Sequence, residues 1–221
     1  GMPQAAGHYN VKITVTDANG AVASQVFPMH VSVLDYFSAT YFPSGTINVP
    51  YSTTLHMEGG TGPYTTVVLQ DNYLPAGMTF DPATMTLSGT PLETGGFNLS
   101  FKTTDSLGNT LARNQYIPIN GNGSANITIN NWHILGPYTV GSSPSYTFSA
   151  CCISSPYTWS IASGTLPPGQ SLSAGGVLSG TVTTAGTYTF LLKAADSTNP
   201  ASVGFRQFEE TVTPISITTN S

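Results

Sequence analysis

The stretch Phe97-Asn-Leu-Ser-Phe-Lys-Thr-Thr-Asp105 alternates mainly apolar and polar residues over nine positions. A period of two is typical of a β-strand that buries one face. The same pattern occurs at residues 9–17 and 188–196, and each copy ends in an aspartate that opens a turn signal. The three aspartates lie 88 and 91 residues apart. This spacing predicts tandem copies of one domain.

Turn motifs accompany the alternating strands. After each aspartate a second alternating strand follows, clearest at residues 24–33, which predicts an antiparallel hairpin. Two motifs precede the strand in both later copies: Leu-Pro-x-Gly lies at residues 74–77 and 166–169, and Leu-Ser-Gly-Thr at 87–90 and 178–181. Proline presets φ and glycine accepts a positive φ, so Leu-Pro-x-Gly predicts a turn. The fold class predicted from these patterns is all-β.

Composition excludes several kinds of protein. Charged residues make up 7% of the 221 residues, against about 25% in an ordinary soluble domain. Five Lys and Arg residues and a net charge of −5 leave no basic surface for nucleic acid or an anionic membrane. No run approaches the ~20 apolar residues of a membrane helix. Aromatic residues, at 10%, recur at regular intervals, which argues against a disordered chain.

A family resemblance lies in residues 156–197. This segment carries Pro-Tyr-Thr-Trp-Ser, Leu-Pro-Pro-Gly, Gly-Val-Leu-Ser-Gly-Thr, Ala-Gly-Thr-Tyr and Asp-Ser in that order. It resembles the bacterial putative-Ig repeats, which are cadherin-like, dystroglycan-type modules found in tandem on secreted and cell-surface proteins. The resemblance implies one Ig-like antiparallel β-sandwich per repeat, an extracellular or cell-surface location, and a stalk, spacer or adhesion role. A calcium-dependent adhesion module and a carbohydrate-binding accessory module are the alternatives.

The repeat register predicts the domain boundaries. Residues 1–7 align with residues 180–186, so we expect 1–34 to be the C-terminal half of a truncated repeat. Complete repeats are expected at 35–121 and 122–214, with 215–221 as a tail or the start of a further repeat. A half repeat falls below the roughly 40 residues that usually fold alone. We therefore expect its hairpin to be covered by the neighbouring repeat or by a second copy in a dimer.

Calcium is the cofactor that the resemblance brings into question, because cadherin-like folds often bind it between domains. The candidate ligands are Asp17, Asp35, Asp105 and Asp196. Calcium takes six to eight oxygen ligands, often from several carboxylates, whereas these aspartates stand alone, three of them at turns that an Asp side chain caps well. Only Asp35 lies in a predicted linker between repeats. We expect no cofactor, with calcium kept open by the resemblance.

The two cysteines, Cys151 and Cys152, are adjacent in a predicted loop. They could form a vicinal disulfide that acts as a loop clip or redox switch, or they could be free thiols or cross-link two molecules. An extracellular setting favours oxidation and ring strain opposes it. Two thiols alone cannot form a zinc site.

Aromatic residues offer a possible sugar-stacking platform, for which Trp132 and Tyr138 are the candidates. Trp159 follows a turn at a position where a sandwich core takes a large aromatic, so we expect it to be buried. The rest of the core predicted for the last copy consists of Leu166, Leu178, Tyr188, Phe190 and Leu192.

No catalytic constellation is evident. The four histidines fall at unrelated repeat positions, and neither a Gly-x-Ser-x-Gly nor a His-x-x-x-His motif occurs. Glu209 and Glu210 have no counterpart in the other copies, so a paired-carboxylate site is unsupported. We expect a non-enzymatic module whose partners are neighbouring repeats and a cell-surface protein or polysaccharide.

Overall fold

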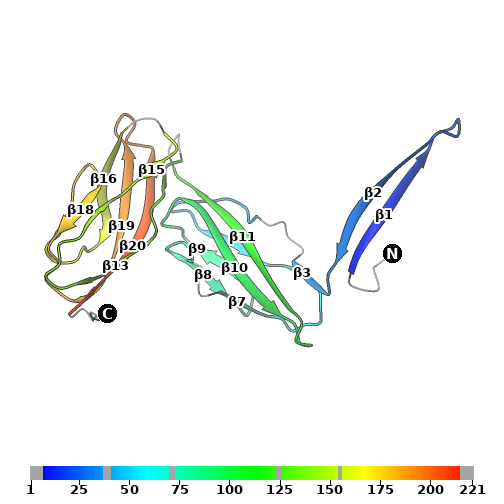
Figure 1. Ribbon diagram of the computed structural model, residues 1–221, viewed down its shortest axis with the longest axis horizontal. Coiled ribbons are helices and arrows are strands. Elements are labelled where there is room, and N and C mark those ends of the chain that lie inside the picture. The colour runs from blue at the N-terminus through cyan, green and yellow to red at the C-terminus, as the bar shows by residue number, and fades with distance from the viewer. Residues whose placement is uncertain (1–6, 37–40, 70–72, 123–125, 154–155, 215–221) are drawn as a thin grey trace, which may run out of the picture.

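The computed structural model describes residues 7–36, 41–69, 73–122, 126–153 and 156–214. They form a two-stranded hairpin followed by two sandwich repeats, whose strands run from Leu34 to Asn120 and from Thr128 to Thr213 (Figure 1). Every element among the described residues is a β-strand, so no helix there could cross a membrane. Residues 1–6 and 215–221, for which the register predicts repeat termini, lie outside the described residues.

The hairpin pairs β1 (Gly7–Thr16) with β2 (Val22–Val31) in antiparallel register. It extends away from the first repeat (Figure 1). One of its faces is apolar and solvent-exposed, with relative exposures from 37% at Val11 to 65% at Val15. The predicted hairpin is therefore confirmed, but the neighbouring repeat does not cover this face.

The described residues of the first repeat form nine strands: β3 (Leu34–Tyr36), β4 (Gly45–Thr46), β5 (Tyr51–Thr54), β6 (Met57–Gly59), β7 (Thr65–Val68), β8 (Met78–Asp81), β9 (Thr86–Gly89), β10 (Gly95–Thr104) and β11 (Thr110–Asn120). A four-stranded sheet, β4-β11-β10-β7, accompanies a three-stranded sheet, β5-β9-β8, and the pair β3-β6.

The second repeat has the same order of strands: β12 (Thr128–Ile129), β13 (Ile134–Thr139), β14 (Ser145–Thr147), β15 (Ala150–Cys151), β16 (Tyr157–Gly164), β17 (Gln170–Leu172), β18 (Val177–Gly180), β19 (Gly186–Asp196) and β20 (Val203–Thr213). Its sheets are β13-β20-β19-β16, β14-β18-β17 and β12-β15. In the first repeat the edge strand β4 pairs parallel with the last strand, β11, and in the second repeat β13 pairs parallel with β20. This identical topology confirms tandem Ig-like sandwiches.

Each repeat has its own core, built from the alternate residues of β10 or β19. Leu99 and Phe101 in the first repeat and Phe190 and Leu192 in the second are at most 1% exposed. Trp159 and Leu178 are also buried, as the sequence predicts. Of the other predicted core residues, Leu166 packs at the margin of the cluster. Tyr188 is only half-buried, because its hydroxyl donates to the exposed Thr184 carbonyl oxygen at 3.0 Å.

The Leu-Pro-x-Gly motifs form the predicted turns. Gly77 and Gly169 have φ values of 82° and 94°, in the left-handed region. A Cβ at Gly77 would lie 2.1 Å from the Thr90 carbonyl oxygen, and one at Gly169 1.9 Å from that of Thr181. Only glycine fits these turns, because both the backbone conformation and the close approach exclude a side chain.

Candidate functional site

A direct hydrogen-bonded contact joins the two repeats. The Thr94 N–H, just before β10, donates to the Phe205 carbonyl oxygen in β20 at 3.0 Å. The Phe205 N–H donates in return to Thr94 Oγ1 at 3.0 Å, and that hydroxyl donates to the Ile127 carbonyl oxygen at 2.9 Å. Thr94 is buried. Its backbone and side chain therefore tie the first repeat to the backbone of the second repeat at Phe205 and at Ile127.

Glu93 makes a second tie beside Thr94. Its carboxylate is fully buried and accepts a hydrogen bond from the Gln207 N–H of the second repeat at 2.8 Å. The other carboxylate oxygen accepts from the Tyr73 hydroxyl and the Ala76 N–H, both at 2.6 Å. Burial raises the pKa of Glu93, and these three donors and the positive charge of Arg206 partly offset the rise. One side chain thus links a loop of the first repeat to the closing strand of the second.

Aromatic rings and a guanidinium group complete the joint. Arg206 of the second repeat lies 5.9 Å from the ring centroid of Tyr73 and 6.0 Å from that of Phe97, both in the first repeat. His133 of the second repeat stacks on Tyr73 with centroids 4.0 Å apart. Burial and the charge of Arg206 lower the pKa of His133, against the opposing influence of Glu209. The neutral imidazole is therefore favoured beside the guanidinium group.

The repeat aspartates do not meet at one site. Asp17, Asp105 and Asp196 each cap their own hairpin turn, where Oδ1 accepts the backbone N–H two residues on, at 2.9, 3.0 and 2.7 Å. Asp105 also accepts from the Asn109 side-chain amide at 2.9 Å, and this bond is the main cause of its lowered pKa. Within the described parts of the chain, no group of three or more His, Cys, Asp or Glu residues could hold a metal ion.

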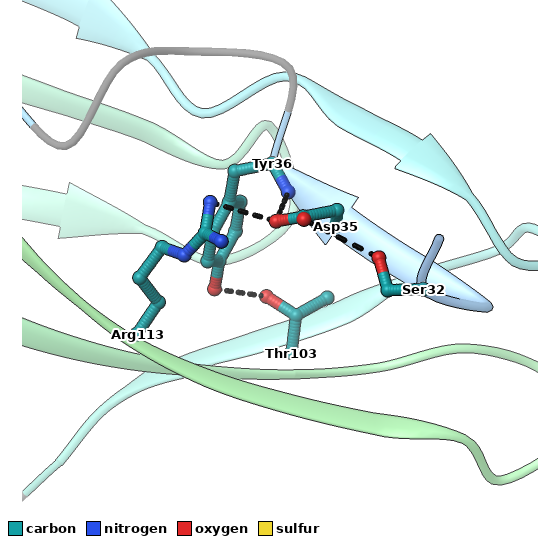
Figure 2. Close-up of polar contacts among 5 residues, drawn as sticks. All are labelled: Ser32, Asp35, Tyr36, Thr103 and Arg113. Atoms are coloured by element: carbon teal, nitrogen blue, oxygen red, sulfur yellow. Dashed lines mark hydrogen bonds and ion pairs between the residues drawn. The ribbon is translucent and has the colours of Figure 1, made fainter. Parts of the chain in front are cut away.

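Asp35, the fourth calcium candidate, forms an ion pair within the first repeat. It lies in β3, where its carboxylate is 2.7 Å from the Arg113 guanidinium group and accepts from the Ser32 hydroxyl at 3.3 Å (Figure 2). The adjacent Tyr36 is buried, and its hydroxyl lies 2.8 Å from Thr103 Oγ1. The polar groups of Asp35 thus fasten the start of the repeat to its last strand.

The remaining sequence candidates are dispersed. Cys151 and Cys152 are joined in a vicinal disulfide, and Cys152 has a φ of 88°. Trp132 is 61% exposed, and its ring contacts His133 at a centroid distance of 4.6 Å. Tyr138 packs against the core of the second repeat instead. The two proposed sugar-stacking residues therefore face different surroundings.

A groove that the sequence analysis missed lies on the outer face of the first repeat. Its volume is about 560 Å³, and it is lined by Tyr41, Asn98, Asn114 and Tyr116. Three of these residues occupy polar positions of the alternating strands β10 and β11, so their outward direction could be predicted from the sequence. Their meeting with Tyr41 could not, because it depends on an isolated parallel bridge between Tyr41 and Tyr116.

Solved structures match most of this chain at low identity. Extracellular cadherin domains 3–6 of protocadherin gamma B2 are 11% identical over 94% of this chain and 59% of that chain, with a TM-score of 0.36. Mouse cadherin-23 EC22–24 is 10% identical over 93% of this chain and 74% of that one, with a TM-score of 0.34.

The solved structure of an enzyme matches a smaller part of this chain. A putative alpha-galactosidase from Bacteroides fragilis is 19% identical over 41% of this chain, with a TM-score of 0.35. This chain spans 19% of the length of that protein.

No curated protein matches. The family model described as "Putative Ig domain" matches residues 33–120 and 126–218, which together cover most of the sequence. The chain therefore belongs to this Ig-domain family and carries two tandem copies of its domain.

Proposed function

We propose that this chain is a non-enzymatic spacer of a larger extracellular or cell-surface protein, in which tandem Ig-like repeats hold other parts at a fixed separation. The observation that carries the proposal is the joint at Glu93 and Thr94. Linkers between independent domains make few contacts across the boundary, and relative motion is then the default. Here backbone hydrogen bonds, a buried carboxylate and an arginine over two rings all cross the boundary.

The rigidity of this joint is proposed to be independent of calcium. The contacts that cross it come from side chains and backbone of the chain itself. The aspartates considered as ligands are hydrogen-bonded at their own turns or, for Asp35, paired with Arg113. A spacer of this kind keeps its geometry when divalent ions are removed.

Small-angle scattering and amide hydrogen exchange on the whole chain test the spacer role. We expect the same maximum dimension in millimolar calcium and in chelator, and slow exchange at the N–H groups of Phe205 and Gln207. Thr94→Val should broaden the distance distribution and speed exchange at Phe205, because its hydroxyl acceptor is gone. Thr187→Val, at an exposed position of β19, is the matched control. A dimension that changes with calcium, or a Thr94→Val profile identical to the unsubstituted chain, contradicts the proposal.

A second function, adhesion between copies, is favoured by the hairpin. The strand β1 has the same alternation as β10 and β19, yet Ile13 is 52% exposed whereas its counterparts Phe101 and Leu192 are fully buried. The apolar face carries no charged residue, since Lys12 lies on the opposite face. A hollow of about 300 Å³ on the hairpin is lined in part by Ile13, Val15 and Phe27.

The occupant we propose for this face is the same face of a second copy. Two copies of an uncharged apolar face can pack around a twofold axis without like-charge repulsion and produce a two-layer sandwich. Analytical ultracentrifugation should show a concentration-dependent dimer. A strict monomer at high concentration argues against self-association and leaves the spacer function standing.

A further inference from the structure

The groove on the outer face of the first repeat has two tyrosines at one end. The rings of Tyr41 and Tyr116 lie 5.7 Å apart with an interplanar angle of 78°, so they form a corner. Tyr41 is 65% exposed. Asn98 and Asn114 extend the lining along β10 and β11, with Asn98 directly opposite Tyr116 in the antiparallel register.

The tyrosine corner is held in place by the fold. The Phe42 N–H donates to the Tyr116 carbonyl oxygen at 2.8 Å, which keeps the residue before it, Tyr41, beside Tyr116. The Tyr116 ring lies across Gly96, where an added Cβ would be 2.1 Å from the phenol oxygen. A ring that is fixed before binding loses little conformational entropy when a ligand arrives.

Besides the two tyrosines, the described lining residues of the groove are asparagines, whose side chains are neutral amides. The Asn114 amide oxygen accepts a hydrogen bond from the Ser100 hydroxyl, which directs its NH₂ group away from that contact. Each asparagine amide offers both donors and an acceptor. Such groups match the hydroxyls of a sugar, which also donate and accept. Among the residues that the structure describes, neither a carboxylate nor a cation lines the groove, so this lining favours a neutral ligand.

We propose that this groove binds a neutral oligosaccharide. The C–H face of one sugar ring packs on Tyr116 against the edge formed by Tyr41, and ring hydroxyls hydrogen-bond with Asn98 and Asn114. The groove volume of about 560 Å³ lies within the range of small-molecule sites. This site goes beyond the spacer function and differs in place from the exposed Trp132, which lies in the second repeat.

Affinity electrophoresis of the full chain tests the proposal, with gels that contain a neutral β-glucan, xylan, galactomannan or starch, and polygalacturonate as a charged comparison. We expect retardation in at least one neutral gel. Tyr116→Ala should weaken binding at least tenfold and Tyr41→Ala about fivefold, because each removes a stacking surface. Gly96→Ala should weaken binding because its Cβ displaces the Tyr116 ring, although none of the four lining residues is itself substituted. Tyr116→Phe should bind like the unsubstituted chain, since the ring is kept.

Control measurements separate a binding defect from a folding defect. Trp132→Ala should leave retardation unchanged, and thermal unfolding of each variant should stay within a few degrees of the unsubstituted chain. The proposal is overturned if no neutral gel retards the chain, or if Tyr116→Ala and Tyr41→Ala migrate like it. It is also overturned if Trp132→Ala alone abolishes binding, or if a proline-rich peptide, added in solution, binds the groove in place of the sugars. None of these outcomes bears on the scattering test of the spacer.

Discussion

Arg113 and Arg206 occupy the same position of the closing strand in the two repeats. Arg113 lies opposite Phe101 and Arg206 opposite Leu192, and these partners stand four residues before Asp105 and Asp196 respectively. Both arginines contact groups on the N-terminal side of their repeat. Arg113 forms an ion pair with Asp35 at the start of the first repeat, whereas Arg206 lies over Tyr73 and Phe97 of the preceding repeat.

The different surroundings of the two arginines predict different costs of removal. Arg113→Leu should change the free energy of unfolding by at most about 1 kcal/mol, because its ion pair is partly solvent-exposed. Arg206→Leu should cost about 1–2 kcal/mol, since cation–π contacts are stronger when desolvated and the buried Glu93 loses a compensating charge. Urea unfolding of both variants measures the difference. A larger cost for Arg113→Leu would contradict the assigned role of Arg206 in the joint.

Glu93 should make the joint sensitive to pH. Its pKa is raised by burial, so the folded chain binds this proton more tightly than the unfolded chain does. The contribution to stability is therefore largest below the ordinary pKa of about 4.5 and declines as pH rises through the raised value. Tyr73 and Arg206 face the carboxylate, and Tyr73 stays neutral because the pKa of its phenol is also raised.

The measurement for Glu93 is a comparison with Glu93→Gln. The difference between the thermal midpoints of the two proteins, recorded from pH 4 to pH 8, should report the contribution of Glu93 alone. Glu210, whose pKa burial also raises, titrates in both proteins and cancels in the difference. The difference should change in favour of the glutamine variant as pH rises. A pH-independent difference would mean that the carboxyl group does not titrate in this range.

Much of the fold could be predicted from the sequence because its information is local. Alternation in residues 97–105 and 188–196 gave the central strands, and the Leu-Pro-x-Gly turns required glycine at φ > 0. The joint could not be predicted, since Glu93 and Gln207 are 114 positions apart and meet only through the relative placement of two domains. Nothing in the local pattern distinguishes Glu93 from a solvent-exposed loop carboxylate.

The core of the first repeat contains a buried polar residue, and an apolar residue in its place should make the protein more stable. Gln115 is fully buried opposite Leu99, and within the described residues neither of its side-chain polar atoms has a hydrogen-bond partner. The equivalent residue of the second repeat, opposite Phe190, is Phe208. Burial of an unpaired amide costs about 1–3 kcal/mol.

Gln115→Met should therefore raise the free energy of unfolding by about 1–3 kcal/mol, because methionine fills a similar volume without polar atoms. The reciprocal substitution, Phe208→Gln, should cost about 3–5 kcal/mol, since it removes a large side chain from a packed core and buries an amide there. Denaturant unfolding of both variants provides the test. A loss of stability in Gln115→Met would show that the amide has a partner that the hydrogen-bond pattern does not include.

The last prediction concerns the exposed hairpin. Ile13→Lys places a charge at the centre of the apolar face, opposite Gln25, while it leaves the backbone ladder of β1 and β2 intact. A dimer formed through this face would bury the two introduced charges together, so we expect dissociation to at least tenfold higher concentration. Thr14→Lys is the matched control, because residue 14 lies on the opposite face, and it should not change the dimer. If both variants associate alike, the copies meet elsewhere. If only Ile13→Lys becomes monomeric, the copies associate through the apolar face of β1. That face would then be buried between two chains, as the equivalent faces of β10 and β19 are buried within their repeats.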